Sequence, residues 1–289
     1  GYDRHFAITE RYGIEMIPVD MTPEGPDMDT VERLAASDAS IKGIWCVPKY
    51  SNPDGITYSD ETVRRFARMK TAADDFMIMW DNAYAVHDLH PEHRDTLINI
   101  LDECKKAGDP NRVMIFASTS KITYAGAGIA VFACAQEVME RMKKLLTIQT
   151  IGFDKMNMLR HARYFKNIDG IMAHMDKQAE LLRPKFKTVL DAFERELGGK
   201  GVAEWINPNG GYFISLNVMD GCAKRVVQLC KDAGVVLTSA GSTYPYGDDP
   251  HDRNIRIAPT YPSIPELECA VSLLCVCTKL AAVEKLLRS

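Results

Sequence analysis

Short apolar runs alternate with amphipathic stretches through the first half of the chain. The apolar runs are rich in β-branched or aromatic residues and lie between charged or turn-forming residues, as buried strands do. We expect strands at residues 15–19, 41–47, 76–80, 112–117 and 129–133, and helices at 29–36, 59–73 and 95–107. Strands and helices that alternate at this spacing predict an α/β fold, with a mostly parallel sheet covered by helices on both faces.

The second half of the chain has a different pattern. Helical periodicity runs over residues 136–146 and again from about 169 to 197, where Gly198 and Gly199 end a long element. Apolar runs predict short strands at 211–217, 235–237 and 254–258, and helical patterns predict helices at 221–233 and 264–287. We therefore expect a large domain over residues 1–168 and a smaller α+β C-terminal domain over residues 169–289, attached through the long helix.

Composition restricts the class of protein. The chain has 289 residues, of which 46% are hydrophobic and 26% charged, so it can bury a large core. Its formal charge of −4 argues against a nucleic-acid partner, which would need a basic surface patch. No apolar run reaches the roughly 18 residues that a membrane span needs, so we expect no membrane partner.

The cysteines indicate a reducing compartment. Eight are present, and none forms a Cys-x-x-Cys pair. Most lie in apolar stretches such as Leu274-Cys275-Val276-Cys277, which favours free core thiols over a structural metal site. The first ten residues have neither the basic start nor the apolar stretch of a signal peptide, so we expect a cytoplasmic protein.

Polar motifs follow two of the predicted strands, at the edge where open α/β sheets bind ligands. Asn52-Pro53-Asp54-Gly55 is made of turn dipeptides that occur anywhere, so alone it indicates only a turn. Asp81-Asn82-Ala83-Tyr84 directly follows the apolar run at 76–80. A buried carboxylate there needs a cation or several donors to stay charged, and a pyridinium nitrogen is such a cation. Taken singly, Asp81 fits a helix N-cap equally well.

A third motif, Ser118-Thr119-Ser120-Lys121, follows the strand predicted at 112–117 and precedes Ala125-Gly126-Ala127-Gly128. A lysine at a desolvated site can lose its proton and attack an aldehyde. Hydroxyls and backbone N–H groups beside it can bind a phosphate. The glycines do not form a dinucleotide fingerprint, because a lysine-bearing loop precedes them and Val131 stands where Gly or Ala is required.

The fourth signal is Arg256, inside the short apolar run at 254–258. An arginine in such a strand is costly unless it is paired, and its planar guanidinium suits a carboxylate. That carboxylate can belong to a substrate or to a structural salt bridge, and the residues alone leave both open.

The order of these four motifs resembles that of the fold-type-I, class I/II aminotransferases, which use pyridoxal 5′-phosphate. The family pattern is Asn-Pro-x-Gly, Asp-x-Ala-Tyr, Ser-x-Ser-Lys and then an arginine in a late strand, and the match covers essentially the whole chain. The loop Ser-Lys-Ile-Thr-Tyr-Ala-Gly-Ala-Gly and the opening Tyr-Asp-Arg-His-Phe are similar to the bacterial MocR-like subgroup of aspartate aminotransferases.

The resemblance implies a role for each matching residue. Lys121 is similar to the lysine that binds the cofactor covalently and moves the substrate proton, and Asp81 to the carboxylate that pairs with the ring nitrogen. Tyr84 and Asn52 resemble the donors to the ring 3-oxygen, and Arg256 resembles the residue that binds the substrate α-carboxylate. The other matches are cofactor contacts, namely the ring-stacking aromatic Tyr2 and the phosphate-binding hydroxyls Ser118 and Ser120.

The reaction that the resemblance implies is transamination between an amino acid and a 2-oxo acid, with aspartate and 2-oxoglutarate as the pair. The family expectation is a homodimer. A dicarboxylate substrate needs a second cation, and the basic stretch after the predicted large domain offers candidates. A solvated helix face explains each of them at least as well. The candidates are Lys155, Arg160, His161 and Arg163.

The chain departs from the family pattern in two ways. Gly128 and Ile129 stand where many relatives carry a phosphate-binding arginine. The N-terminal part of the family fold, with its Gly-rich phosphate loop, is also expected to be absent from this segment, which alone should then bind the cofactor poorly. Two other functions stay open: a lyase or decarboxylase that uses the same cofactor on the same fold, and a non-catalytic effector-sensing domain of a MocR-like regulator.

Overall fold

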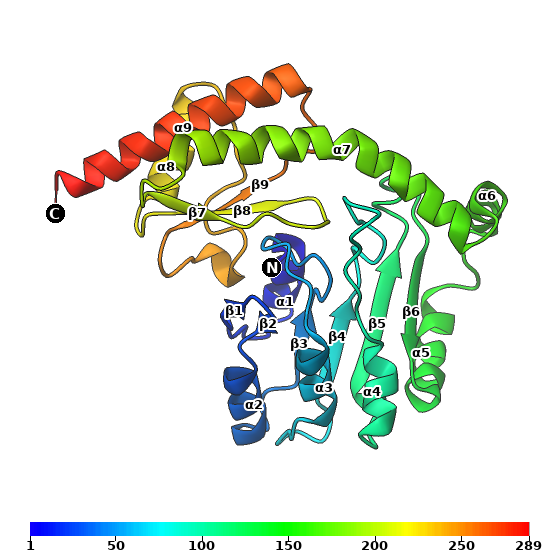
Figure 1. The fold of residues 1–289 in the computed structure, drawn as a ribbon. Coiled ribbons are helices and arrows are strands. Elements are labelled where there is room, and N and C mark those ends of the chain that lie inside the picture. The colour runs from blue at the N-terminus through cyan, green and yellow to red at the C-terminus, as the bar shows by residue number, and fades with distance from the viewer. Residues whose placement is uncertain (289) are drawn as a thin grey trace.

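The computed structural model describes residues 1–288, which form two main sheets connected by a long helix (Figure 1). The first sheet has the order β3-β4-β5-β6. Its strands are β3 (Gly43–Cys46), β4 (Met77–Asp81), β5 (Val113–Ser118) and β6 (Ala130–Cys134). The pairs β3–β4 and β4–β5 are parallel and β5–β6 is antiparallel. The expected α/β fold with a mostly parallel sheet is confirmed, with β6 as its antiparallel member.

Three helices cover one face of the first sheet. They are α2 (Met28–Ser37), α3 (Asp60–Arg68) and α4 (Ile100–Lys106). Side chains alternate across a strand, so Ile78 and Trp80 of β4 point to the same face. Both are buried in one apolar cluster with residues of these helices. This cluster holds the three helices against the sheet, and Asp81 lies at the carboxyl end of β4.

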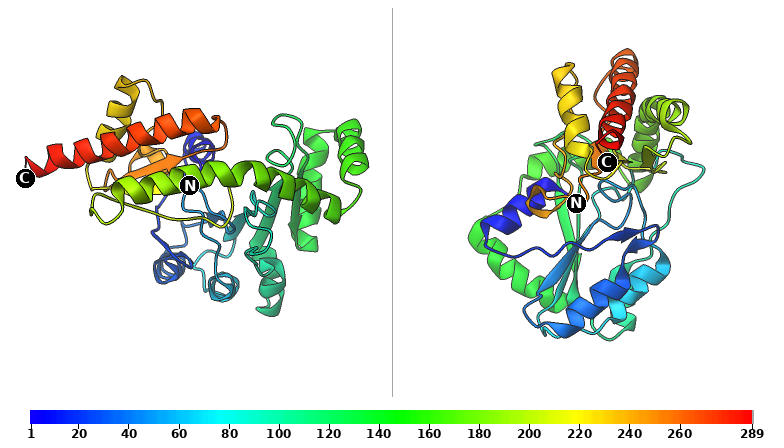
Figure 2. Two further views of the ribbon diagram at one scale, coloured as in Figure 1. Left: turned by 45° about the horizontal axis from the view of Figure 1, so that its top comes forward. Right: turned by 90° about the vertical axis from the view of Figure 1, so that its left-hand side faces the viewer.

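Helices on the opposite face give it less cover. The ring of His5, in α1 (Asp3–Arg11), stacks on Trp45 of β3 with the ring centres 4.0 Å apart. Trp45 nevertheless remains 41% exposed. In the right-hand view of Figure 2, α1 and α5 (Gln136–Gln149) lie on the side of the strands opposite to α2 and α3.

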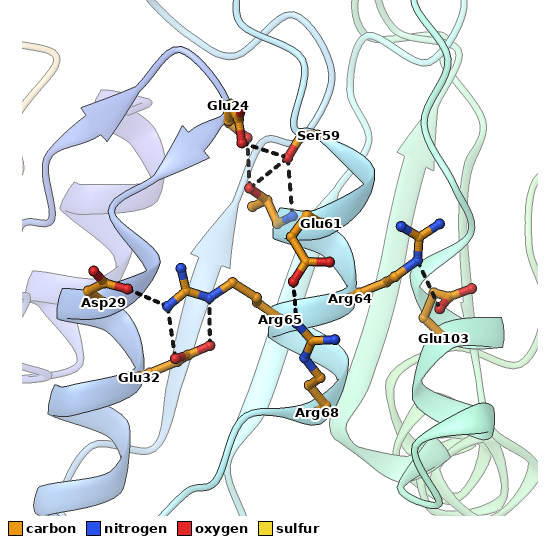
Figure 3. A network of polar contacts seen from close by, with 10 residues as sticks. Glu24, Asp29, Glu32, Ser59, Glu61, Arg64, Arg65, Arg68 and Glu103 are labelled. Carbon is orange, nitrogen blue, oxygen red and sulfur yellow. Dashed lines mark hydrogen bonds and ion pairs between the residues drawn. The ribbon is translucent and has the colours of Figure 1, made fainter.

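Charged side chains connect α2 and α3 on the outside of the molecule (Figure 3). Arg65 of α3 donates from two nitrogens to the carboxylate of Glu32, at 2.9 Å each, and also contacts Asp29. Ser59 begins α3, because its hydroxyl accepts a hydrogen bond from the N–H of Thr62 at 3.2 Å. Exposed ion pairs add little stability each, so this network mainly sets how the two helices lie side by side.

The second sheet is antiparallel in the order β7-β8-β9. Its strands are β7 (Ala203–Trp205), β8 (Ile214–Val218) and β9 (Asn254–Ile257). Three helices pack with it into one apolar core: α7 (Ile168–Leu197), α8 (Ala223–Asp232) and α9 (Ile264–Leu286). The remaining elements are short: the hairpin of β1 (Met21–Thr22) and β2 (Gly25–Pro26), α6 (Lys155–Phe165), and the 3₁₀ turns η1 (Pro110–Arg112) and η2 (Pro245–Gly247).

Helix α7 connects the regions of the two sheets. At 1.5 Å per residue its 30 residues span about 45 Å. Its beginning lies beside α6 near the first sheet, and its later turns pack along α9 (Figure 1). The division into domains at residues 168 and 169 stays a prediction, and it falls at the first turn of this helix.

The structure corrects several expected elements. Residues 15–19 and 235–237 form no strand, since no neighbouring strand offers them a hydrogen-bonding edge within residues 1–288. Helix α4 begins only at Ile100, where the Asn99 side chain accepts from the N–H of Leu101. The elements that were not expected include α1, α6 as a separate helix, β7, the β1–β2 hairpin and the two 3₁₀ turns. No helix in the described part of the chain is long and apolar enough to cross a membrane.

We predict that Phe193→Ala will strongly destabilise the fold. Phe193 of α7 is fully buried in the core of the second sheet. Removing a buried phenyl ring costs about 3–5 kcal/mol of unfolding free energy, because a cavity remains. Leu181→Ala on the same helix is the matched control. Leu181 is 73% exposed, so its loss should change the unfolding free energy by less than about 0.5 kcal/mol. Urea denaturation followed by circular dichroism measures both, and equal effects would contradict the assigned core.

Candidate functional site

Lys121, Asp81 and Tyr84 come together beyond the carboxyl ends of β4 and β5. The Nζ atom of Lys121 lies 5.4 Å from the centre of the Tyr84 ring. Burial raises the pKa of Asp81, while the charge of Lys121 and a hydrogen bond from Trp45 lower it. Asp81 is the last residue of β4 and no helix follows it, so it is not a helix N-cap. An amine and a carboxylate therefore share one partly buried site.

Tyr84 is the buried member of this group, with 2% of its surface exposed. Burial raises the pKa of its phenol, the charge of Asp81 raises it further, and Arg256 acts in the opposite direction. The phenol therefore keeps its proton at neutral pH and can donate a hydrogen bond. Tyr2 also acts electrostatically on Tyr84, although its own side chain is 45% exposed.

Arg256 reaches the same site from the second sheet. It lies in β9, and its Nη1 donates to Oδ1 of Asn52 at 3.3 Å. Its guanidinium carbon is 4.8 Å from the centre of the Phe213 ring. Residues 52–54 do form a turn, with a cis peptide bond between Asn52 and Pro53, so the turn interpretation is right as well.

The structural salt bridge considered for Arg256 is not formed within residues 1–288. Its guanidinium has no ion pair there, and its buried Nε atom has no hydrogen-bond partner. An arginine with donors to spare beside a partly buried amine can bind an anion. The substrate-carboxylate interpretation of Arg256 stays a prediction.

Ser118 and Ser120 lie on the loop that carries Lys121. Ser118 ends β5, and its hydroxyl accepts from the N–H of Ser120 at 3.3 Å. The loop folds back so closely that a Cβ atom on Gly128 would collide with the hydroxyl of Ser120. This contact gives a physical reason why residue 128 is glycine. Neither serine contacts Asp81 or Arg256 directly in the described residues.

Two helices hold the lysine loop from behind. The Nε2 atom of His161, in α6, lies 3.0 Å from the hydroxyls of both Thr119 and Thr123. From α7, His174 and Gln178 bond to the carbonyl of Ile122 at 2.9 and 2.8 Å. His161 is therefore part of the loop's support and not of a solvated face. The other basic residues of its stretch are exposed: Lys155, Arg160 and Arg163.

Sequence reasoning missed a buried ion pair behind the site. Lys49 Nζ lies 2.9 Å from Asp88 Oδ1, and the two side chains are 9% and 4% exposed. Tyr50 donates to the same carboxylate oxygen at 2.6 Å. The pair ties the segment after β3 to the segment after β4. Its signal in the sequence is the Lys-Tyr dipeptide that lies between the end of β3 and the Asn52 turn.

A short seam joins the second sheet to this network. The N–H of Leu89 donates to the carbonyl of Asn209 at 2.9 Å, and the N–H of Gly211 donates to the carbonyl of His87 at 2.8 Å. Gly210 must be glycine, because a Cβ atom there would collide with the ring of Tyr50. Gly211 has φ +81°, which side-chain-bearing residues rarely adopt. The seam brings the start of β8 against the lysine loop.

Known proteins resemble this chain in sequence and in fold. The family model for aspartate amino-transferases matches residues 1–289. The chain belongs to the aspartate aminotransferase family. An aspartate aminotransferase of Corynebacterium glutamicum is 49% identical over 284 residues, which are 98% of this chain and 65% of that protein.

Solved structures of the family agree on the fold. An aspartate transaminase from C. glutamicum superposes with a TM-score of 0.96 at 48% identity, over 99% of this chain and 67% of that one. The α-aminoadipate aminotransferase LysN of Thermus thermophilus superposes with a TM-score of 0.81 at 18% identity, over 98% of this chain and 70% of that one, and this likeness shows the fold alone. The chain thus spans about two thirds of the length of these relatives.

We predict that Asp88→Asn will destabilise the protein by about 3–5 kcal/mol, because it leaves the Lys49 ammonium buried without its carboxylate. Asp176→Asn is the matched control. Asp176 pairs with Arg94 at 2.7 Å, but its side chain is 39% exposed, so its loss should cost no more than about 1 kcal/mol. Urea unfolding of both variants gives the comparison. Equal stabilities for Asp88→Asn and the parent would show that the buried pair is not formed.

Proposed function

We propose that this chain carries the catalytic site of a pyridoxal 5′-phosphate-dependent aminotransferase. One observation carries the proposal: the Lys121 amine lies 5.4 Å from the centre of the Tyr84 ring, the charges of Asp81 and Arg256 act on the same phenol, and neither cation has an ion pair within residues 1–288. Family membership and the activity named for the C. glutamicum relative support it.

The residues present fit this cofactor. Asp81 is a carboxylate whose pKa burial raises, and a protonated ring nitrogen opposite it would stabilise its charged form. Asn52 uses its oxygen for Arg256, which leaves its amide N–H free to join the neutral Tyr84 phenol as a donor to the ring 3-oxygen. Lys121 would hold the cofactor covalently. Its other contacts would be the stacking ring of Tyr2 and the phosphate-binding hydroxyls of Ser118 and Ser120.

The chain's own side chains perform the remaining work. Bound cofactor supplies an electron-withdrawing ring that acidifies the substrate's α-proton. Arg256 binds the substrate α-carboxylate through its planar fork and so fixes where Cα lies. The free amine of Lys121 takes the proton from Cα and later returns one. A positioned general base of this kind contributes roughly 10²–10⁴-fold to the rate.

The substrates we propose are aspartate and 2-oxoglutarate, on the strength of the names of the C. glutamicum proteins. Eight free cysteines fit a cytoplasmic enzyme.

We also propose a homodimer, because exposed apolar side chains gather on α5, α6 and the segment between them. They include Leu145, Ile148, Ile151, Phe153 and Met156. A single-chain mass in sedimentation at micromolar concentration would argue against the dimer.

We predict that Lys121→Ala lowers glutamate formation from aspartate and 2-oxoglutarate by at least about 10²-fold, because the general base is lost. Lys200→Ala, at an exposed lysine just after α7, should behave as the parent does. Coupled assays of glutamate and oxaloacetate provide the measurement. Retained turnover in Lys121→Ala would remove the basis of the proposal, and pyruvate with ammonia as products would identify a lyase instead.

A further inference from the structure

Two side chains from different parts of the chain contact the main-chain carbonyl oxygen of Lys121. The hydroxyl of Tyr212 donates to it at 2.7 Å, across 91 positions of sequence. The Nε2 atom of His87 lies 3.3 Å from the same oxygen. Tyr212 comes from the segment before β8 of the second sheet, whereas His87 follows β4 of the first sheet. Lys121 thus has its backbone fixed by both sheets at once.

His87 can only be a donor in this contact. It is 3% exposed, and burial is the largest cause that lowers its pKa to about 4. The bond to the Lys121 carbonyl raises that pKa, while the charge of Lys121 lowers it. At neutral pH the ring therefore carries one proton. A carbonyl oxygen accepts only, so this proton sits on Nε2, and Nδ1 has no partner among residues 1–288.

Tyr212 also lies next to the residue that contacts Arg256. The ring of Phe213 is 4.8 Å from the guanidinium carbon of Arg256. Tyr84 packs edge-on against the rings of Tyr212 and His87, with centres 5.9 and 5.4 Å apart. Two consecutive aromatic residues therefore link the backbone of Lys121 to the side chain of Arg256.

We propose that Tyr212 and His87 are positioning residues for Lys121, and that the Tyr212 hydroxyl sets the distance between the Lys121 amine and Arg256. The inference rests on the proposed transaminase function. The lysine side chain is a flexible four-carbon stem, so its amine is placed only if its backbone is held. A substrate bound by Arg256 then presents its Cα to that amine. Both groups keep their relative positions because Tyr212 holds the Lys121 backbone and its neighbour Phe213 contacts Arg256.

Tyr212→Phe in the holoenzyme tests the proposal, since it removes one hydroxyl and little else. We predict that kcat falls about tenfold, because misplaced reacting groups lose effective molarity, while KM for aspartate changes by less than about twofold. In Tyr212→Phe the carbonyl oxygen of Lys121 also loses a hydrogen bond, so its partial negative charge favours the protonated form of the Lys121 nitrogen more strongly. The pH midpoint of the bound cofactor's visible absorbance should therefore rise by about half a unit or more. Tyr261→Phe, at a side chain 95% exposed, is the matched control and should match the parent in all three.

A second pair of variants tests His87 and covers a Tyr212→Phe protein that does not fold. His87→Gln keeps an N–H donor and should hold kcat within about threefold of the parent, whereas His87→Phe keeps bulk, lacks the donor and should lose about tenfold. Parent-like kcat and absorbance midpoint in Tyr212→Phe, or equal behaviour of the two His87 variants, would overturn the inference. A parent enzyme without transamination would instead refute the proposed function, whatever these variants do.

Discussion

The site depends on one close approach. The segment before β8, residues 209–211, packs against residues 87–89 and the ring of Tyr50. Arg256 lies in the second sheet, whereas Asp81 ends β4 of the first sheet and Lys121 lies on the loop after β5, so no local pattern can bring them together. The approach is possible because Gly210 leaves room for the ring of Tyr50 and Gly211 adopts φ +81°. Main-chain hydrogen bonds between residues 87–89 and 209–211 then hold the two surfaces in register.

The cations near the site are of two kinds, the buried Lys49 and the half-buried Lys121 and Arg256. Lys49 follows a buried strand, as Lys121 nearly does, and Asp88 answers its charge at 2.9 Å. Such a pair is satisfied, so its contribution is to structure. Lys121 and Arg256 have no ion pair in residues 1–288, and the charge of Lys121 acts on Asp81, a carboxylate whose pKa burial raises. The contrast shows which charges remain available for chemistry.

Much of this arrangement follows from the sequence, for identifiable reasons. Parallel strands end at the same edge of a sheet, so Asp81 and the Lys121 loop could be placed together from the apolar runs before them. Ser263 and Glu266 form a capping box, and α9 begins where the pattern predicted. Helix α1 was missed, and no side-chain N-cap marks where it begins.

Contacts between the sheets were beyond prediction from sequence. The bond from Tyr212 to the Lys121 carbonyl depends on how two separately folded layers are oriented, and periodicity carries no information on that. The same holds for His161, whose place in a basic stretch indicated solvent, whereas the turn between α5 and α6 directs it to Thr119 and Thr123. At residues 15–19 the pattern predicted a strand that does not form. An apolar run becomes a strand only where another strand offers it hydrogen bonds.

The distribution of unsatisfied polar atoms supports the same placement of the site by a separate route. Four buried side-chain atoms in residues 1–288 have no hydrogen-bond partner. Two of them belong to His87, which bonds to the Lys121 carbonyl, and to Arg256, which contacts Asn52; the other two are in Asn82, which lines a separate cavity with Lys49 and Trp80, and in Thr278 on α9. Each such atom costs roughly 1–3 kcal/mol of stability. A fold tolerates that cost where its polar groups are arranged to bind a ligand and not to bind one another. The amine of Lys121, the carboxylate of Asp81 and the guanidinium of Arg256 are also arranged without ion pairs in residues 1–288.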